Sequence, residues 1–148
     1  MSHDKIKARM LWLKRIGKAA RYKWAERKLM LGLCLQIRAM REHRNWTMQE
    51  LAKQAGIHLI TVYRLEKFPW SCWPTINTLL KLAAAFDVVL IVRFVSWSEF
   101  VAWAEGIPQT NKGLSTSALC PKSFSEEFGQ PGAPPSATGE AQKVLDKP

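Results

Sequence analysis

Few residues of this sequence have the types and spacing that catalysis or metal binding requires. The 148-residue chain contains no glycine-rich phosphate loop, no pair of catalytic carboxylates and no nucleophile motif. Its histidines are scattered, and Cys34, Cys72 and Cys120 lack the spacing of metal ligands. No secretion signal precedes these cysteines, so we expect free thiols in a reducing compartment. The sequence therefore predicts no enzymatic activity, no cofactor and no metal site.

Residues 47–66 combine polar side chains with apolar side chains at helical spacing. Thr47 can cap a helix on which Leu51 and Ala55 share one face. Gly56 ends this helix, because glycine enters a left-handed turn without strain. The apolar spacing resumes on a second short helix at Ile57, Val62 and Leu65. Two short helices joined by a glycine-containing turn form a helix-turn-helix unit, although an ordinary antiparallel helix pair is the alternative.

This stretch resembles the XRE-type helix-turn-helix family, the lambda repressor and Cro type. The matching residues are Leu51, Ala52, Gly56, Ile57, Val62, Leu65 and Glu66. The resemblance extends over roughly residues 31 to 95. In that family an arginine of the first helix pairs with the glutamate that ends the recognition helix. The resemblance therefore implies a structural ion pair between Arg41 and Glu66.

The resemblance also implies that the helix-turn-helix contacts DNA. The expected DNA-binding residues are Thr47, Gln49, His58, Leu59, Ile60, Thr61, Tyr63, Arg64 and Lys67. Arg64 has the forked donors that fit a guanine edge, and Tyr63 and Lys67 could reach phosphates.

The sequence departs from the family pattern at three of the positions that face DNA. Met48 stands where the family usually has glutamine. Leu59 and Ile60 cannot hydrogen-bond to bases, although they could contact thymine methyl groups. An apolar recognition face could instead serve a protein partner.

The basic residues are concentrated before the motif. Residues 1–47 hold 13 Lys/Arg and 3 Asp/Glu, which gives this segment the net charge of +10 that the entire chain has. Residues 5–31 have the composition and spacing of one long helix. It could pack on the domain or on a second subunit, become ordered on DNA phosphates, or lie on a membrane surface.

Large aromatic residues precede and follow the predicted helix-turn-helix in the sequence. Trp46 is expected in the core. The loop KFPWSCWP that follows Glu66 contains Trp70 and Trp73, and we expect one of them to pack on the core or on the N-terminal helix. The alternative for this loop is a wedge or stacking contact to DNA.

Residues 88–95 predict a β-strand, because seven of these eight residues are apolar and many are β-branched. A lone strand needs a partner, so we expect a ribbon across a dimer axis or an edge offered to another protein. A short helix should follow at residues 96–105. The remainder is expected to be disordered, with SFSEEF (residues 123–128) as its one candidate docking segment.

The predicted fold class is all-α, with a five-helix lambda-repressor-like DNA-binding domain. The expected parts are a basic N-terminal helix (1–31), the helix-turn-helix domain (32–87), a dimerising strand and short helix (88–104), and a disordered tail (105–148).

This organisation predicts a sequence-specific transcriptional regulator of bacterial or phage type, acting as a repressor, which reads the major groove with residues 58–67. Its partners would be double-stranded DNA and a second copy of the chain. The alternative is an antitoxin or another interaction module that binds a toxin or host regulator. No apolar run reaches the roughly 18 residues of a membrane span, so we expect no membrane partner and a cytoplasmic, nucleoid-associated location.

Overall fold

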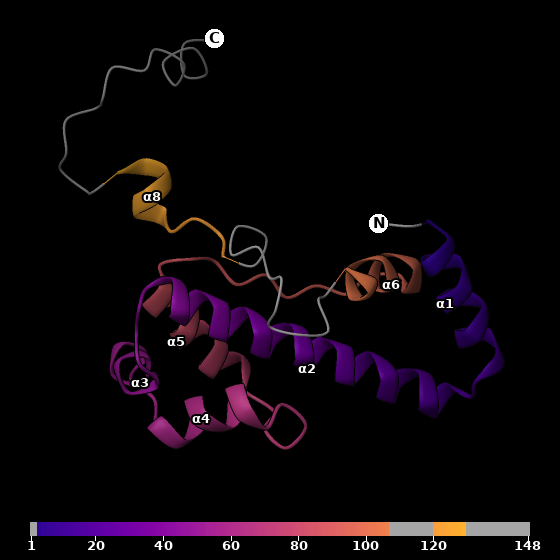
Figure 1. Ribbon diagram of the computed structural model, residues 1–148, viewed down its shortest axis with the longest axis horizontal. Coiled ribbons are helices and arrows are strands. Elements are labelled where there is room, and N and C mark those ends of the chain that lie inside the picture. The colour runs from indigo at the N-terminus through magenta and orange to yellow at the C-terminus, as the bar shows by residue number, and fades with distance from the viewer. Residues whose placement is uncertain (1–2, 107–119, 130–148) are drawn as a thin grey trace, which may run out of the picture.

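The computed structural model describes residues 3–106 and 120–129, and this part of the chain is helical and contains no strand (Figure 1). Its helices are α1 (His3–Arg15), α2 (Lys18–His43), α3 (Met48–Ala55), α4 (Leu59–Lys67), α5 (Ile76–Phe86), α6 (Trp97–Glu105) and α8 (Phe124–Phe128). The prediction of an all-α fold class is therefore confirmed for the described residues.

The 26-residue helix α2 is the longest element, at about 39 Å for a rise of 1.5 Å per residue. The predicted boundary near Leu31 is wrong, because the chain stays helical through Gly32, which is buried. The break lies instead at Gly17, whose extended backbone precedes the first turn of α2. A single continuous helix thus carries α1 and α6 at one end and the helix-turn-helix at the other (Figure 1).

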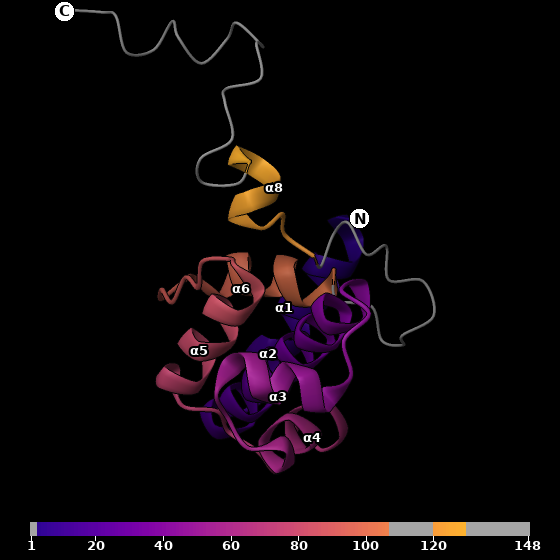
Figure 2. The same cartoon turned by 90° about the vertical axis from the view of Figure 1, so that its left-hand side faces the viewer.

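The core of the helix-turn-helix unit lies between the C-terminal half of α2 and helices α3, α4 and α5, which Figure 2 shows gathered at one end. Its buried residues are Ile37, Met40, Leu51, Ala52, Ala55, Val62, Leu65, Leu82 and Phe86. Trp46 packs on this core as expected, with its ring stacked on that of Phe86 at 6.0 Å.

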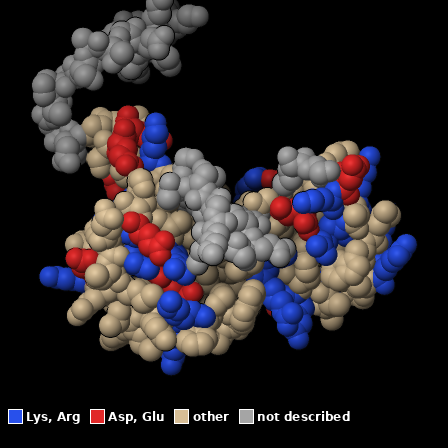
Figure 3. Space-filling model, in the orientation of Figure 1, with Lys and Arg blue, Asp and Glu red and all other residues tan. Residues whose placement is uncertain are grey.

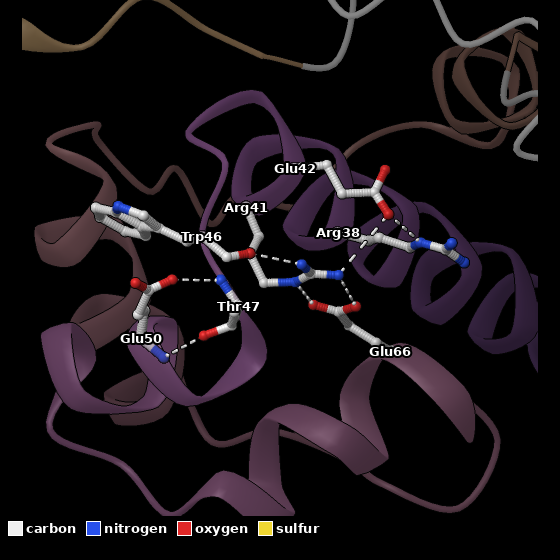
Figure 4. Close-up of polar contacts among 7 residues, drawn as sticks. All are labelled: Arg38, Arg41, Glu42, Trp46, Thr47, Glu50 and Glu66. Atoms are coloured by element: carbon white, nitrogen blue, oxygen red, sulfur yellow. Dashed lines mark hydrogen bonds and ion pairs between the residues drawn. The ribbon is translucent and has the colours of Figure 1, made fainter.

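Helix α3 begins and ends at the residues that the sequence analysis predicted. The Thr47 hydroxyl accepts a hydrogen bond from the Glu50 backbone N–H, and the Glu50 carboxylate accepts one from the Thr47 N–H at 2.6 Å (Figure 4). This capping box satisfies two donors at the start of α3. Gly56 ends α3 at φ 63°, in the left-handed region that glycine occupies without strain.

The predicted ion pair fixes α4 to α2. Arg41 Nε and Nη2 donate to the two carboxylate oxygens of Glu66, at 2.6 and 2.9 Å (Figure 4). The third donor, Arg41 Nη1, reaches the Trp46 carbonyl at 2.7 Å. The side chains are only 12% and 1% exposed, so the pair is buried as well as bidentate.

A second packing layer surrounds the N-terminal half of α2. The buried residues of α1 and α6 are Leu13, Val101 and Ala104. The Arg9 guanidinium lies 5.3 and 5.5 Å from the ring centroids of Trp12 and Trp24, and it pairs with Glu105 at 2.6 Å. Of the three roles considered for the N-terminal segment, packing within the chain is therefore realised, through α1 on α6.

Residues 88–95 do not form the predicted strand. Beyond Val88 this segment makes no backbone hydrogen bond to another described segment, so it has no strand with which to pair. It remains an extended connection between α5 and α6, and Phe94 is fully exposed. The short helix predicted after it is confirmed as α6.

In the part of the predicted disordered tail that the structure describes beyond Gly106, residues 120–129, the chain forms the helix α8. Ser123 and Glu126 form a capping box, and α8 docks on the end of α5. The Phe124 N–H donates to the Asp87 carbonyl at 2.9 Å, and the Ser125 hydroxyl donates to the Asp87 carboxylate at 2.8 Å. These bonds lower the pKa of Asp87, with the Ser125 hydroxyl as the largest cause. The expectation for residues 107–119 and 130–148 lies outside the described residues.

We expect the substitution Glu66→Gln to lower the free energy of unfolding by about 3 kcal/mol, because it leaves the buried Arg41 guanidinium without its counter-charge. Urea denaturation followed by circular dichroism at 222 nm measures this loss. Glu42→Gln removes a carboxylate that is 53% exposed and should cost less than about 1 kcal/mol. Equal losses of unfolding free energy in the two variants would contradict a larger contribution from the buried pair.

The capping box should give α3 a dependence on pH. The backbone and then the hydroxyl of Thr47 hold the pKa of Glu50 below its ordinary value of 4.5. A lowered folded-state pKa contributes stability that is complete above 4.5 and is lost as the pH falls through the folded value. The difference in urea midpoint between the native protein and Glu50→Gln should therefore shrink between about pH 6 and about pH 3. A difference that stays constant over this range would contradict the role of the charge.

Candidate nucleic-acid interface

Helix α4 presents one side to the core and the other to solvent. Val62 and Leu65 are fully buried, and together with the Glu66 carboxylate they fix the inner side. The outer side carries the exposed residues Leu59, Ile60, Tyr63, Arg64 and Lys67. The helix is therefore held rigidly by one side and is free along the other, which is the arrangement that a groove-binding helix requires.

The predicted site residues lie on α4 and at the starts of the two helices. His58 is the N-cap residue of α4 and is exposed, and its side chain makes no capping hydrogen bond. The amides of Leu59 and Ile60 at this end are therefore not satisfied by a side-chain cap and could meet an anion. Thr61 is half-buried, and it is the least accessible of the predicted α4 residues.

The start of α3 supplies the other predicted contacts. Gln49 is exposed in the first turn. The Thr47 hydroxyl oxygen accepts a hydrogen bond from the Glu50 N–H. The hydroxyl proton is still available for donation to a phosphate. Met48 is partly buried against the core, which accounts for an apolar residue where the related family has glutamine.

The cationic residues of α4 are available for an external partner. Neither Arg64 nor Lys67 forms an ion pair within the described ranges. In the view of Figure 3, Lys and Arg side chains project from the lower edge of the molecule, beneath α4 and α2, whereas the Asp and Glu side chains lie higher. The edge that carries α4 is therefore electropositive, as a phosphate-binding surface should be.

Exposed aromatic residues follow α4, in the loop for which the sequence analysis gave a contact to DNA as the alternative. Trp70 and Trp73 are 57% and 56% exposed, so neither is buried in the core; of the two places expected for them, they lie beside the N-terminal helix. They border the N-terminal half of α2 without being covered by it. Phe68 is also exposed and lies edge-on to Tyr63, with ring centroids 5.9 Å apart. The run of aromatic residues directly after α4 was the signal in the sequence.

Cysteine chemistry and metal binding are not prominent in the described residues. All three cysteines are free thiols. Burial, followed by the proximity of Cys72 and Glu66, raises the pKa of the Cys34 thiol to about 12, so it stays protonated and unreactive at neutral pH. No group of three His, Cys, Asp or Glu residues in this part of the chain could hold a metal ion. Likewise, none of its helices is long and apolar enough to cross a membrane.

Comparison with known proteins agrees with the helix-turn-helix arrangement of α3 and α4. A family model described as helix-turn-helix matches residues 37–90, which run from the C-terminal half of α2 past the end of α5. No match was found among the curated proteins or among the solved structures. The resemblance that the sequence predicted is thus confirmed for this segment. Residues 37–90 are thus similar to the helix-turn-helix domains of the XRE, lambda Cro-like family.

Proposed function

We propose that the protein is a transcriptional regulator, not an enzyme, and that it binds a specific DNA sequence with α4 in the major groove. The observation that carries the proposal is the exposed outer side of α4 on a helix whose inner side is locked by the buried Arg41–Glu66 pair. A helix that reads base edges must keep its orientation to within a fraction of a hydrogen-bond length, and this pair supplies that constraint.

Sequence reading would depend on three side chains of α4. Arg64 can donate two hydrogen bonds to a guanine edge, which is worth about 1–3 kcal/mol of discrimination. Leu59 and Ile60 lie in the first turn and are about half exposed. They offer apolar surface to thymine methyl groups. We expect an operator in which a guanine is flanked by thymines.

The phosphate contacts surround these residues. Lys67 and Tyr63 lie on the outer side of α4, and Gln49 and the Thr47 hydroxyl lie at the start of α3. His58 and the free amides at the start of α4 would meet a further phosphate. These contacts carry no sequence information, but they set the position of α4 on the duplex.

A second copy of the chain is the proposed partner of residues 88–95. Within this segment Val89, Ile91 and Val92 are largely exposed, and Phe94 is 107% exposed. Antiparallel pairing of two such segments across a twofold axis would satisfy their free backbone groups and cover these side chains. A dimer would place two copies of α4 about 34 Å apart, in successive major grooves. Such a dimer bound over a promoter would act as a repressor, of bacterial or phage type.

A protein-interaction module is the second candidate function. The observation in its favour is that Leu59, Ile60 and Tyr63 give α4 a substantially apolar outer side. An antitoxin, or a protein that binds a host regulator, could use this side on an apolar partner surface. Salt dependence separates the two functions, because phosphate-dominated binding weakens steeply with salt.

Arg64→Ala should relax the base preference at one position of a duplex selected from random sequences, and it should weaken binding by about 1–3 kcal/mol. The measurement is a gel-shift titration of the native protein and the variant against the selected duplex and duplexes with single base changes. Arg38→Ala, which removes an arginine paired with Glu42 on α2, should leave the base preference unchanged. Failure of the native protein to enrich any sequence would overturn the proposal and favour the protein-interaction function.

Phe94→Asp should convert a dimer into a monomer, because it places a carboxylate in the proposed ribbon. Sedimentation velocity measures the oligomeric state. The variant should fold normally, since Phe94 makes no buried contact in the single chain. Phe128→Asp alters another exposed phenylalanine, on α8, and should leave the dimer intact. An unchanged sedimentation coefficient for Phe94→Asp would exclude this segment as the interface.

A further inference from the structure

A pocket lies between the α4–α5 loop and the N-terminal half of α2. It has a volume of about 260 Å³, and it lies outside the two helices α3 and α4 of the helix-turn-helix. Its lining residues are Lys23, Glu26, Arg27, Met30, Trp70 and Trp73. Two segments that are far apart in the sequence therefore build one concave surface.

The side chains of this pocket have the composition of a nucleic-acid contact. Trp70 and Trp73 each expose more than half of their surfaces and line the same pocket, and adjoining exposed apolar side chains are typical of an interaction site. Lys23 and Arg27 lie four residues apart on α2, are exposed, and form no ion pair with any described residue. Indole rings beside free cations match the sugars or bases and the phosphates of a nucleic-acid strand.

Charge favours a polyanion over a neutral or basic protein surface. The pocket contains two cations and the single carboxylate of Glu26, so its net charge is +1. Its charged residues belong to the segment 1–47, whose net charge is +10. An apolar protein partner would gain nothing from Lys23 and Arg27, whereas a phosphate backbone would release counterions on binding both of them.

The position of the pocket relates it to the DNA that α4 would bind. Trp70 follows the last residue of α4, Lys67, by only three positions. Helix α2 continues past the C-terminal end of α4 in Figure 1, and it carries Lys23 and Arg27 in that direction. The pocket therefore lies directly beyond the C-terminal end of α4, beside the surface that would face the duplex.

We propose that the pocket is a second contact to the same DNA duplex, independent of base sequence. Lys23 and Arg27 bind phosphates that flank the base pairs read by α4, and the indoles of Trp70 and Trp73 pack against the neighbouring deoxyriboses. Glu26 limits the strength of this contact. The inference rests on the proposed DNA-binding function and assigns to α2 a role that the helix-turn-helix unit alone does not provide.

The test uses the full chain and a selected duplex with long flanks, with binding measured by fluorescence anisotropy as a function of salt. The double variant Lys23→Gln/Arg27→Gln should reduce the salt slope by about two, because two phosphates are no longer neutralised by the protein. It should weaken binding about tenfold or more at about 0.1 M salt. Its base preference should equal that of the native protein. Trp70→Leu/Trp73→Leu should weaken binding with little change in the salt slope.

Two control variants separate the pocket from general charge. Lys81→Gln/Lys122→Gln removes the same number of charges from exposed positions on α5 and just before α8, outside the pocket, and should change the slope by less than about one. Glu26→Gln removes the opposing carboxylate and should strengthen binding. If the native protein selects a sequence but the pocket and control double variants behave alike, the inference is overturned and the proposed function stands. If the native protein binds no DNA, both the inference and the proposed function are overturned.

Discussion

The buried pair between Arg41 and Glu66 is the interaction on which the orientation of α4 depends. Val62 and Leu65 hold α4 by apolar contact, which resists removal of the helix but permits it to rotate or slide. The guanidinium adds direction, because its fork matches the two carboxylate oxygens of Glu66 and its third donor reaches the Trp46 carbonyl. One side chain thus joins α2, the turn before α3 and the end of α4. Because an ion pair out of water gains little net stability over a well-packed apolar pair, its importance here is geometric.

The continuous helix α2 extends this constraint over the rest of the molecule. Helices are stiff over tens of ångströms, so the layer formed by α1 and α6 at one end has a fixed relation to α4 at the other (Figure 1). The Arg9–Glu105 pair, with Arg9 between Trp12 and Trp24, anchors that far layer. The pocket of Lys23, Arg27, Trp70 and Trp73 lies between the two ends and therefore keeps a constant distance from α4.

The elements that the sequence predicted correctly depend on local patterns. The helix-turn-helix follows from the spacing of Leu51, Gly56 and Leu65, which a span of some 15 residues contains. The errors concern features decided by distant contacts. The N-terminal helix was expected to end near Leu31, but the chain stays helical through this region, where Met30, Gly32 and Cys34 are buried. Residues 88–95 have strand propensity without a partner among the described residues. The exposure of Trp70 and Trp73 could not be predicted, because it depends on how far α2 runs beside the loop.

If α4 binds DNA as proposed, its apolar outer side requires that other residues of the chain supply most of the phosphate contacts. Leu59 and Ile60 can distinguish thymine by its methyl group, but they gain no hydrogen bond and attract no phosphate. Arg64 and Lys67 are the two cations of α4, and two charges supply a small share of the affinity that a site-specific protein needs. The remainder must come from outside the recognition helix. The 13 Lys/Arg residues of segment 1–47 are the available source, and α2 is the element that can bring them to the same duplex. Under the proposed function, specificity and affinity would thus be divided between two helices, which the Arg41–Glu66 pair holds together.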